Sequence, residues 1–216
     1  MSMKIKVNDL SKKFKNNIIF EDVNLEFESG KIYGIVGLNG SGKSVFLKIL
    51  TGLYYPTSGE VLFDGVNYNR NNMFPKSLRA LIEKPSFFPD LSAFDNLKLL
   101  ANIQNKISDE EIKNILNLVN LENNSKKYYQ FSLGMKQKLA IASVLMEDVD
   151  VIILDEPFNA IEEKTVNKIK DYLLSIKKDK IIILASHHKE DLNDLKVNEL
   201  YKFEEGKVCK VKWKKI

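Results

Sequence analysis

The eight residues Gly37–Ser44, with the sequence GLNGSGKS, constrain the fold more than any other stretch of the 216-residue chain. Their spacing is G-x-x-x-x-G-K-[ST], in which glycines let several backbone N–H groups approach the oxygens of a polyphosphate. Lys43 can then hold the β and γ phosphates, and the Ser44 hydroxyl can ligate Mg²⁺. The stretch therefore predicts a phosphate-binding loop. The residues expected to contact the nucleotide here are Asn39, Gly40, Ser41, Gly42, Lys43, Ser44 and Val45.

The residues on either side of this loop predict the strand and the helix that such a loop requires. Residues 32–36 form a short apolar run after a Ser-Gly turn, as expected of a buried strand. Beyond the loop, Phe46, Ile49, Leu50 and Leu53 recur at helical spacing. A helix that begins at the loop points its free N–H groups and its dipole at the anion. The alternative, a flexible glycine loop with an incidental lysine, does not account for this order of elements.

The chain before the loop predicts antiparallel strands. Apolar and polar residues alternate over 5–7 and over 23–27, which is the period of a half-buried strand. Phe14 lies between these stretches in a lysine-rich turn. Its ring could stack on a purine base or belong to the core, and the residues alone leave both readings open.

The second half of the chain predicts helices followed by parallel strands. Residues 89–146 have a helical pattern, with a capping-box spelling at 108–111 and Ser132 as the cap of a further helix. Apolar strands at 149–154 and 181–185 then enclose a helix. Such alternation implies a parallel sheet, and ligands of such sheets bind at the carboxyl ends of the strands.

Four polar side chains and the phosphate loop all fall at these carboxyl ends. Asp155 follows its strand, where a carboxylate can hold Mg²⁺ opposite Ser44, and Glu156 is placed to polarise a water for attack on the γ phosphate. Capping of the next helix is the alternative for this acidic pair. His187, after Ser186, can hydrogen-bond the phosphate and the attacking water. We expect the neighbouring His188 to face solvent, because adjacent residues point to opposite sides.

Composition excludes several classes of protein. The net charge of +4 is spread over 33 basic and 29 acidic residues without a compact basic and aromatic patch, so we expect no specific nucleic-acid partner. The one cysteine, Cys209, rules out an internal disulfide and suits a reducing compartment. Neither an export signal nor an apolar run of about 20 residues is present, so a membrane role is expected only through a partner.

Taken together, these motifs resemble those of the ATP-binding cassette (ABC) ATPases. Beside the phosphate loop, the resemblance rests on 131–137 (FSLGMKQ), 151–157 (VIILDEP) and Ser186-His187, in the family's order and spacing. It implies an α/β fold: a P-loop NTPase core of the RecA-like kind with an antiparallel β subdomain and an inserted α-helical subdomain. The whole chain, 1–216, would be one nucleotide-binding domain, with the core at about 1–83 and 147–216 and the helical subdomain at about 84–146.

The resemblance also implies a second cassette. In the family, two cassettes face each other head to tail, so ATP on one phosphate loop is closed by the signature segment of the other. Ser132, Gly134 and Met135 would supply that contact, which agrees with the anion affinity of a helix N-terminus. Phe14 would stack on adenine. The cofactors implied are ATP and Mg²⁺, and the active unit is a homodimer or a heterodimer.

Two residues depart from the family's pattern. Glu83 stands where the family usually has glutamine, so a carboxylate adds charge at the metal and gives up a donor. Ser44, Glu83 and Asp155 are therefore the expected metal ligands, beside Glu156 and His187 as catalytic residues. Glu162 stands where the family usually has aspartate. It is either part of the site or only a favourable charge in the first turn of a helix.

The sequence of the signature segment, 131–137, together with Glu83 and its neighbours, resembles the sequences of one branch of the family, the peptide-antibiotic (bacitracin- and lantibiotic-type) resistance and immunity exporters. The leading expectation is an ATP-hydrolysing subunit that serves a separate transmembrane permease, in the cytoplasm and peripherally attached to the membrane through that permease. We expect the permease to dock around 84–94, where Phe87, Phe88 and Leu91 offer apolar surface. The alternatives are a soluble ABC ATPase that acts on DNA or ribosomes, and a nucleotide-responsive module with little turnover.

Overall fold

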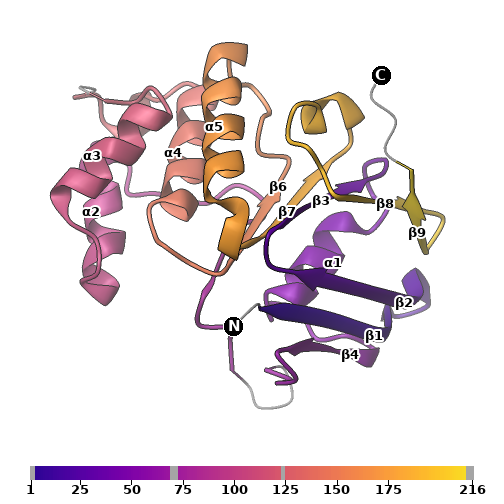
Figure 1. The fold of residues 1–216 in the computed structure, drawn as a ribbon. Helices are drawn as coiled ribbons and strands as arrows, with labels where there is room; N and C mark the ends of the chain where they lie inside the picture. The colour runs from indigo at the N-terminus through magenta and orange to yellow at the C-terminus, as the bar shows by residue number, and fades with distance from the viewer. Residues whose placement is uncertain (1–2, 69–72, 123–124, 213–216) are drawn as a thin grey trace.

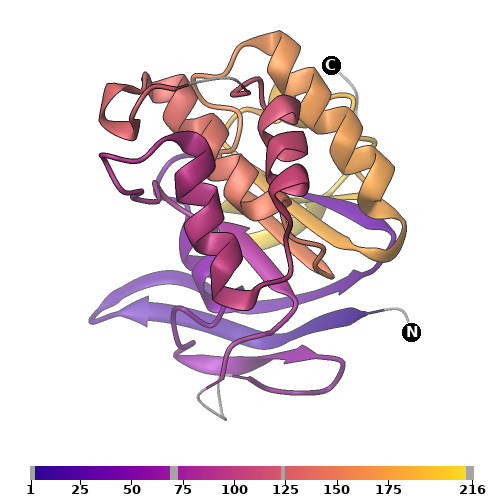
Figure 2. The same ribbon diagram turned by 90° about the vertical axis from the view of Figure 1, so that its left-hand side faces the viewer.

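Two sheets and a layer of helices make up the fold in the computed structural model, which describes residues 3–68, 73–122 and 125–212. A mostly parallel sheet lies at the centre (Figure 1). Most of the helices cover one of its faces, and an antiparallel sheet with helix α1 lies against the other (Figures 1 and 2). The chain therefore has the predicted α/β class. Within the described residues, no helix has both the length and the apolar character needed to cross a membrane.

The central sheet has the strand order β5-β6-β7-β3-β8-β9. Neighbouring strands run parallel from β5 to β8, and β9 pairs antiparallel with β8. Every residue of β6 and β7 is buried, because helices or the second sheet cover both faces and the strands are rich in valine, isoleucine and leucine. The strands are β3 (Lys31–Val36), β5 (Leu78–Leu81), β6 (Val151–Asp155), β7 (Ile181–Ser186), β8 (Glu199–Glu204) and β9 (Lys207–Val211).

The second sheet is antiparallel, as predicted, in the order β2-β1-β4. Its strands are β1 (Lys4–Phe14), β2 (Asn17–Glu28) and β4 (Ser58–Phe63). Their apolar side chains point to the central sheet and enclose α1 (Lys43–Leu50) in one core, where the rings of Phe46 and Phe203 lie 5.2 Å apart. The prediction that the apolar stripe of this helix reaches Leu53 is wrong. The helix ends at Leu50, Gly52 follows with φ +80°, and Leu53 is 58% exposed.

The helices of the other layer share a second core with the opposite face of the sheet. They are α2 (Ala93–Gln104), α3 (Asp109–Leu118), α4 (Leu133–Leu145) and α5 (Glu163–Ile176), with short 3₁₀ segments at Tyr128–Gln130, Lys177–Asp179 and Lys189–Leu192. Ser108 and Glu111 form the predicted capping box at α3, and Ser132 caps α4 as predicted. Helices α2 to α4 fall within 84–146, and we retain the division into a core and a helical subdomain as a proposal.

Candidate functional site

The phosphate loop joins β3 to α1 and takes conformations that require glycine. Gly40 has φ +81°, and nothing lies within 4 Å of the place where a β-carbon would project, so the backbone is open to a ligand. Gly42 is the N-cap of α1 with φ +101°, and a β-carbon there would lie 2.9 Å from Ile19. Within the described chain, the buried Ser41 Oγ has no hydrogen-bond partner. Of the other predicted contacts, Asn39 is exposed and Val45 is half-buried.

Lys43 is folded back onto this loop. Its ammonium donates to the carbonyl oxygens of Gly37 (2.6 Å) and Leu38 (3.1 Å) and lies 4.0 Å from Glu156 Oε1. The side chain is only 5% exposed, and burial lowers the pKa of Lys43, although the charges of Glu156 and Asp155 oppose this shift. A phosphate placed in the loop would favour the charged ammonium, as a nucleotide site requires.

Ser44 and Asp155 meet although they are far apart in sequence. The Ser44 hydroxyl donates to Asp155 Oδ2 over 2.5 Å. The other oxygen, Oδ1, is buried and has no hydrogen-bond partner in the described part of the molecule. Burial raises the pKa of Asp155, which marks a carboxylate short of compensating charge. A hydroxyl and a carboxylate with a spare oxygen are ligands that suit Mg²⁺, so these two residues fit the ion that nucleotide chemistry uses.

Glu156 is held in a strained conformation beside His187. Its φ is +48°, which costs a non-glycine residue about 1 kcal/mol or more. The backbone N–H of Glu156 donates to Ala185 over 2.9 Å, and Oε1 accepts from the His187 N–H over 2.8 Å. His187 Nδ1 lies 2.7 Å from Oε2, but the two are not aligned as a hydrogen bond. Because a carboxylate oxygen cannot donate a hydrogen bond, a favourable contact between these two atoms requires a proton on Nδ1.

Asp191 supports this part of the site, and the sequence pattern did not single it out. The Ser186 hydroxyl donates to Asp191 Oδ2 over 2.5 Å and accepts from the His188 N–H over 3.0 Å. These bonds fix the turn that carries His187. His188 is exposed, as predicted.

Glu83 does not join Ser44 and Asp155. It follows β5 with φ +64°, and its carboxylate forms an ion pair with Lys48 of α1. It is nevertheless near the site, because its charge contributes to the raised pKa of Asp155 after burial and Glu156. Nothing in the spacing of Lys48 predicts this pair, since the two residues are 35 positions apart. The metal role of Glu83 stays a prediction.

Glu162 joins α5 to α4. It is the N-cap residue of α5, but its side chain forms no capping bond. Instead its carboxylate pairs with the buried Lys138 of α4 and accepts from the Thr165 hydroxyl over 2.8 Å. The hydrogen bond from Lys138 lowers the pKa of Glu162 to about 2. Glu162 is therefore more than a favourable charge at a helix start.

The signature segment, residues 131–137, leads into α4 and contacts the segment that follows β6, which the sequence did not predict. Met135 donates its N–H to the Ser132 hydroxyl over 3.2 Å, the helix-capping bond. A β-carbon on Gly134 would lie 2.4 Å from the carbonyl oxygen of Ala160. The Gln137 amide donates to the carbonyls of Glu156 (3.2 Å) and Pro157 (3.0 Å). Among the described residues, no hydrogen bond joins the signature segment to the phosphate loop of the same chain.

Phe14 is at the end of β1 and is 43% exposed, so its ring does not belong to the core. Its ring meets Tyr54 edge to face at 5.9 Å, and the Lys12 ammonium lies 4.7 Å from its centroid. An exposed aromatic ring beside a cation is available for a planar, electron-rich ligand. Stacking on adenine stays a prediction.

Comparison with known proteins supports the resemblance to the ABC ATPases. A family model described as "ABC transporter" matches residues 20–159. The uncharacterized ABC transporter ATP-binding protein YybJ of Bacillus subtilis (strain 168) is 45% identical over 193 residues, which cover 88% of each chain. The lantibiotic transport ATP-binding protein SrtF of Streptococcus pyogenes is 36% identical over 85% of this chain and 80% of its own. The bacitracin transport ATP-binding protein BcrA of Enterococcus faecalis is 33% identical over 87% of this chain and 62% of its own.

Solved structures of ABC transporter ATP-binding subunits have the same fold as this chain. The ATP-binding subunit of an ABC transporter superposes with a TM-score of 0.84 at 25% identity, covering 96% of this chain and 89% of that one. The dimeric cassette MJ0796 superposes with a TM-score of 0.83 at 23% identity, covering 97% and 99%. By its motifs, fold and relatives, this chain belongs to the ABC transporter family, whose ATP-binding domains hydrolyse ATP.

Proposed function

We propose that this chain is the ATP-hydrolysing subunit of an exporter for a peptide antibiotic or a similar amphiphile, working through a separate permease chain. One observation carries the proposal. The phosphate loop with Lys43, the Ser44–Asp155 pair and the Glu156–His187 pair come together at the carboxyl end of one parallel sheet. Relatives named for lantibiotic and bacitracin transport support the class of substrate.

Each residue has a role that its present contacts support. Lys43 would exchange the carbonyls of Gly37 and Leu38 for the phosphates of ATP. Glu156, whose carboxylate is fixed by the His187 N–H, would accept the proton of the attacking water. His187 would orient the water and the γ phosphate. Ser44 and Asp155 would hold Mg²⁺, which when bound neutralises phosphate charge; Glu83 is a third candidate ligand once it leaves Lys48.

A second cassette would complete the site. Ser132, Gly134 and Met135 do not reach their own phosphate loop by hydrogen bonds in the described chain, yet they lie at a helix N-terminus, where an anion is stabilised. We propose that they close ATP bound to a partner cassette. Phe14 would stack on adenine at the other end of the nucleotide.

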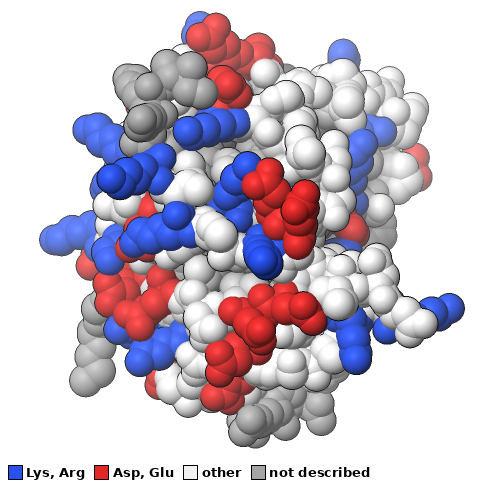
Figure 3. All heavy atoms as spheres, turned by 90° about the vertical axis from the view of Figure 1, so that its right-hand side faces the viewer, with Lys and Arg blue, Asp and Glu red and all other residues white. Residues whose placement is uncertain are grey.

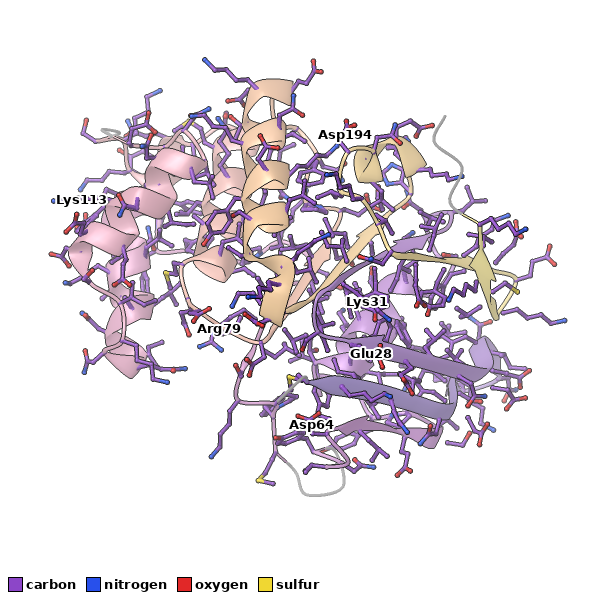
Figure 4. All side chains as sticks on the ribbon, in the orientation of Figure 1. Glu28, Lys31, Asp64, Arg79, Lys113 and Asp194 are labelled. Atoms are coloured by element: carbon purple, nitrogen blue, oxygen red, sulfur yellow. The ribbon has the colours of Figure 1, made fainter. Side chains whose placement is uncertain are left out.

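A groove beside α2 is the proposed docking site for the permease. Phe88 is 62% exposed, whereas Phe87 is half-buried against Tyr128, so the apolar surface differs from the one expected around 84–94. A second exposed apolar residue is Ile103, near the end of α2, which is 76% exposed beside a cavity of about 360 Å³. Arg79, on the edge strand β5 (labelled in Figure 4), pairs with Glu147, and both residues line this cavity. A permease segment with an apolar face and a polar rim would fit this groove, and would hold the chain at the membrane.

The enzymatic role is tested by measuring ATP hydrolysis with and without Mg²⁺. We expect Glu156→Gln to lower the turnover rate by about 100-fold or more while ATP still binds, because the general base is lost. Glu110→Gln, an exposed acid in the first turn of α3, is the matched control. An unchanged rate in Glu156→Gln would contradict the catalytic assignment.

The transport role is tested by expressing the chain with its permease in an antibiotic-sensitive bacterium. We expect resistance to a lantibiotic or to bacitracin that Glu156→Gln abolishes. Ile103→Glu should abolish both resistance and co-purification with the permease while leaving basal ATP hydrolysis intact. Ile18→Glu, at another exposed apolar position, on β2 (51% exposed), should change neither. Co-purification that survives Ile103→Glu and Phe88→Glu would exclude the groove as the docking site.

A further inference from the structure

The pair formed by Lys48 and Glu83 joins a half-buried ammonium to an exposed carboxylate. The side chain of Lys48 is 15% exposed, whereas Lys98, which pairs with Asp109 on the surface, is 39% exposed. Glu83 supplies the compensating charge for this ammonium, because Lys48 Nζ donates to its Oε1. The ammonium of this pair is therefore better shielded from solvent than that of Lys98, although the Glu83 carboxylate is 67% exposed.

Lys48 is also held on its other side. Its ammonium lies 5.0 Å from the centroid of Tyr54, and Tyr54 donates its N–H to the Lys48 carbonyl over 3.0 Å. Tyr54 in turn meets Phe14 edge to face. One ammonium thus contacts both Glu83, which follows β5, and Tyr54 of the aromatic pair at the proposed base site.

The position of Lys48 connects the pair to the phosphate loop. Lys48 lies in the last turn of α1, the helix whose first residue is Lys43. The ion pair with Lys48 fixes the direction of the Glu83 carboxylate relative to α1. This restraint matters because Glu83 is an exposed residue with a left-handed backbone. A glutamine at position 83 would gain less from a neighbouring ammonium, since it carries no charge.

We propose that Lys48 is a positioning residue for Glu83: it neutralises the carboxylate and holds it against α1, so that Glu83 reaches the Ser44–Asp155 pair only by giving up this ion pair. The inference deepens the proposed function, because it rests on the assignment of Glu83 as a ligand of Mg²⁺. In this inference, the strength of the ion pair with Lys48 determines how readily the Glu83 carboxylate can bind Mg²⁺.

The first test measures the pair without nucleotide or metal. Urea unfolding of the wild type, Lys48→Met, Glu83→Gln and the double variant forms a double-mutant cycle. Each single substitution should raise the unfolding equilibrium constant by about two- to fivefold, and the double variant by no more than either one. Lys98→Met is the matched control outside the site. Additive effects of the two substitutions would overturn the inference, because the residues would then be independent.

The second test titrates Mg²⁺ while a fluorescent ATP analogue binds. Lys48→Met should lower the half-saturating Mg²⁺ concentration about two- to fivefold, because Glu83 is then free to join the metal site. Lys48→Arg should restore the wild-type value, and Lys48→Met in the Glu83→Gln background should shift it much less. An equal shift in that background would overturn the role of Lys48. If Mg²⁺ has no effect on binding in the wild type, the proposed metal site itself fails, and the unfolding cycle still decides whether the pair exists.

Discussion

Gly134 has no room for a side chain, because its α-carbon faces the backbone of the loop that follows Glu156. A β-carbon would lie 2.4 Å from the Ala160 carbonyl oxygen, and backbone cannot move aside as a flexible side chain can. We predict that Gly134→Ala lowers the free energy of unfolding by about 1–3 kcal/mol, the cost of overpacking. Leu133→Ala, at the exposed neighbouring position, should change it by about 0.5 kcal/mol or less. Urea denaturation measures both, and equal stability of the two variants would contradict the close contact.

Glu162 makes the stability of the protein depend on pH through Lys138. Its folded pKa of about 2 lies below the ordinary 4.5, so its stabilising contribution is complete above pH 4.5 and is lost as the pH falls toward 2. Because Glu162 is 53% exposed, we expect about 1 kcal/mol or less. Replacing Lys138 by methionine should therefore destabilise the protein at pH 7 and progressively less between pH 4.5 and 3. Urea unfolding across this range tests the sign, and a difference that grows with acidity would contradict it.

Helix α4 carries three separate contacts to the segment that follows β6. Gly134 packs on Ala160, Gln137 binds the carbonyls of Glu156 and Pro157, and Lys138 binds Glu162. The first residues of α4 are those proposed to meet a partner's ATP. A displacement of α4 would therefore act directly on the backbone of Glu156, the proposed general base of the same chain, through packed backbone and hydrogen bonds, without passing through the sheet.

The same elements show how far a sequence can predict a site. Glycine spacing and apolar periodicity predict where α1 begins and, closely, where β3, β6 and β7 end, because these are local properties, and parallel pairing then brings Ser44 to Asp155. Contacts between distant side chains have no such local signal. The Lys138–Glu162 pair depends on how two helices pack. Leu53 lies beyond the end of α1, where Gly52 takes a left-handed conformation that the apolar periodicity does not signal.

Charge is balanced locally on one face of the molecule. On the face drawn in Figure 3, acidic and basic side chains lie side by side. Glu28 pairs with Lys31 at 2.8 Å where the two sheets meet (Figure 4), and Lys210 pairs with Glu199 at 2.9 Å. A face that neutralises its own lysines gives little attraction for a phosphate backbone, so we retain the expectation of no specific nucleic-acid partner.

Each chain of the proposed dimer supplies only half of each of the two ATP sites. An experiment that mixes two inactive variants tests this proposal. Lys43→Ala removes the phosphate-loop half, and Ser132→Glu places a repelling carboxylate in the signature half, so each variant alone should be inactive. In a head-to-tail dimer of one chain of each kind, one site has both defects and the other has none.

If the chain forms homodimers, mixing equal amounts of the two variants should recover about a quarter of the wild-type ATPase rate, since half of the dimers are mixed and each of these has one intact site. Adding Lys43→Ala/Ser132→Glu to either single variant is the matched control and should recover nothing, because every site then keeps at least one defect. A dimer in which each chain completes its own site would show no recovery in any mixture. Recovery confined to the first mixture would therefore require that Ser132 acts on the phosphate loop of another chain.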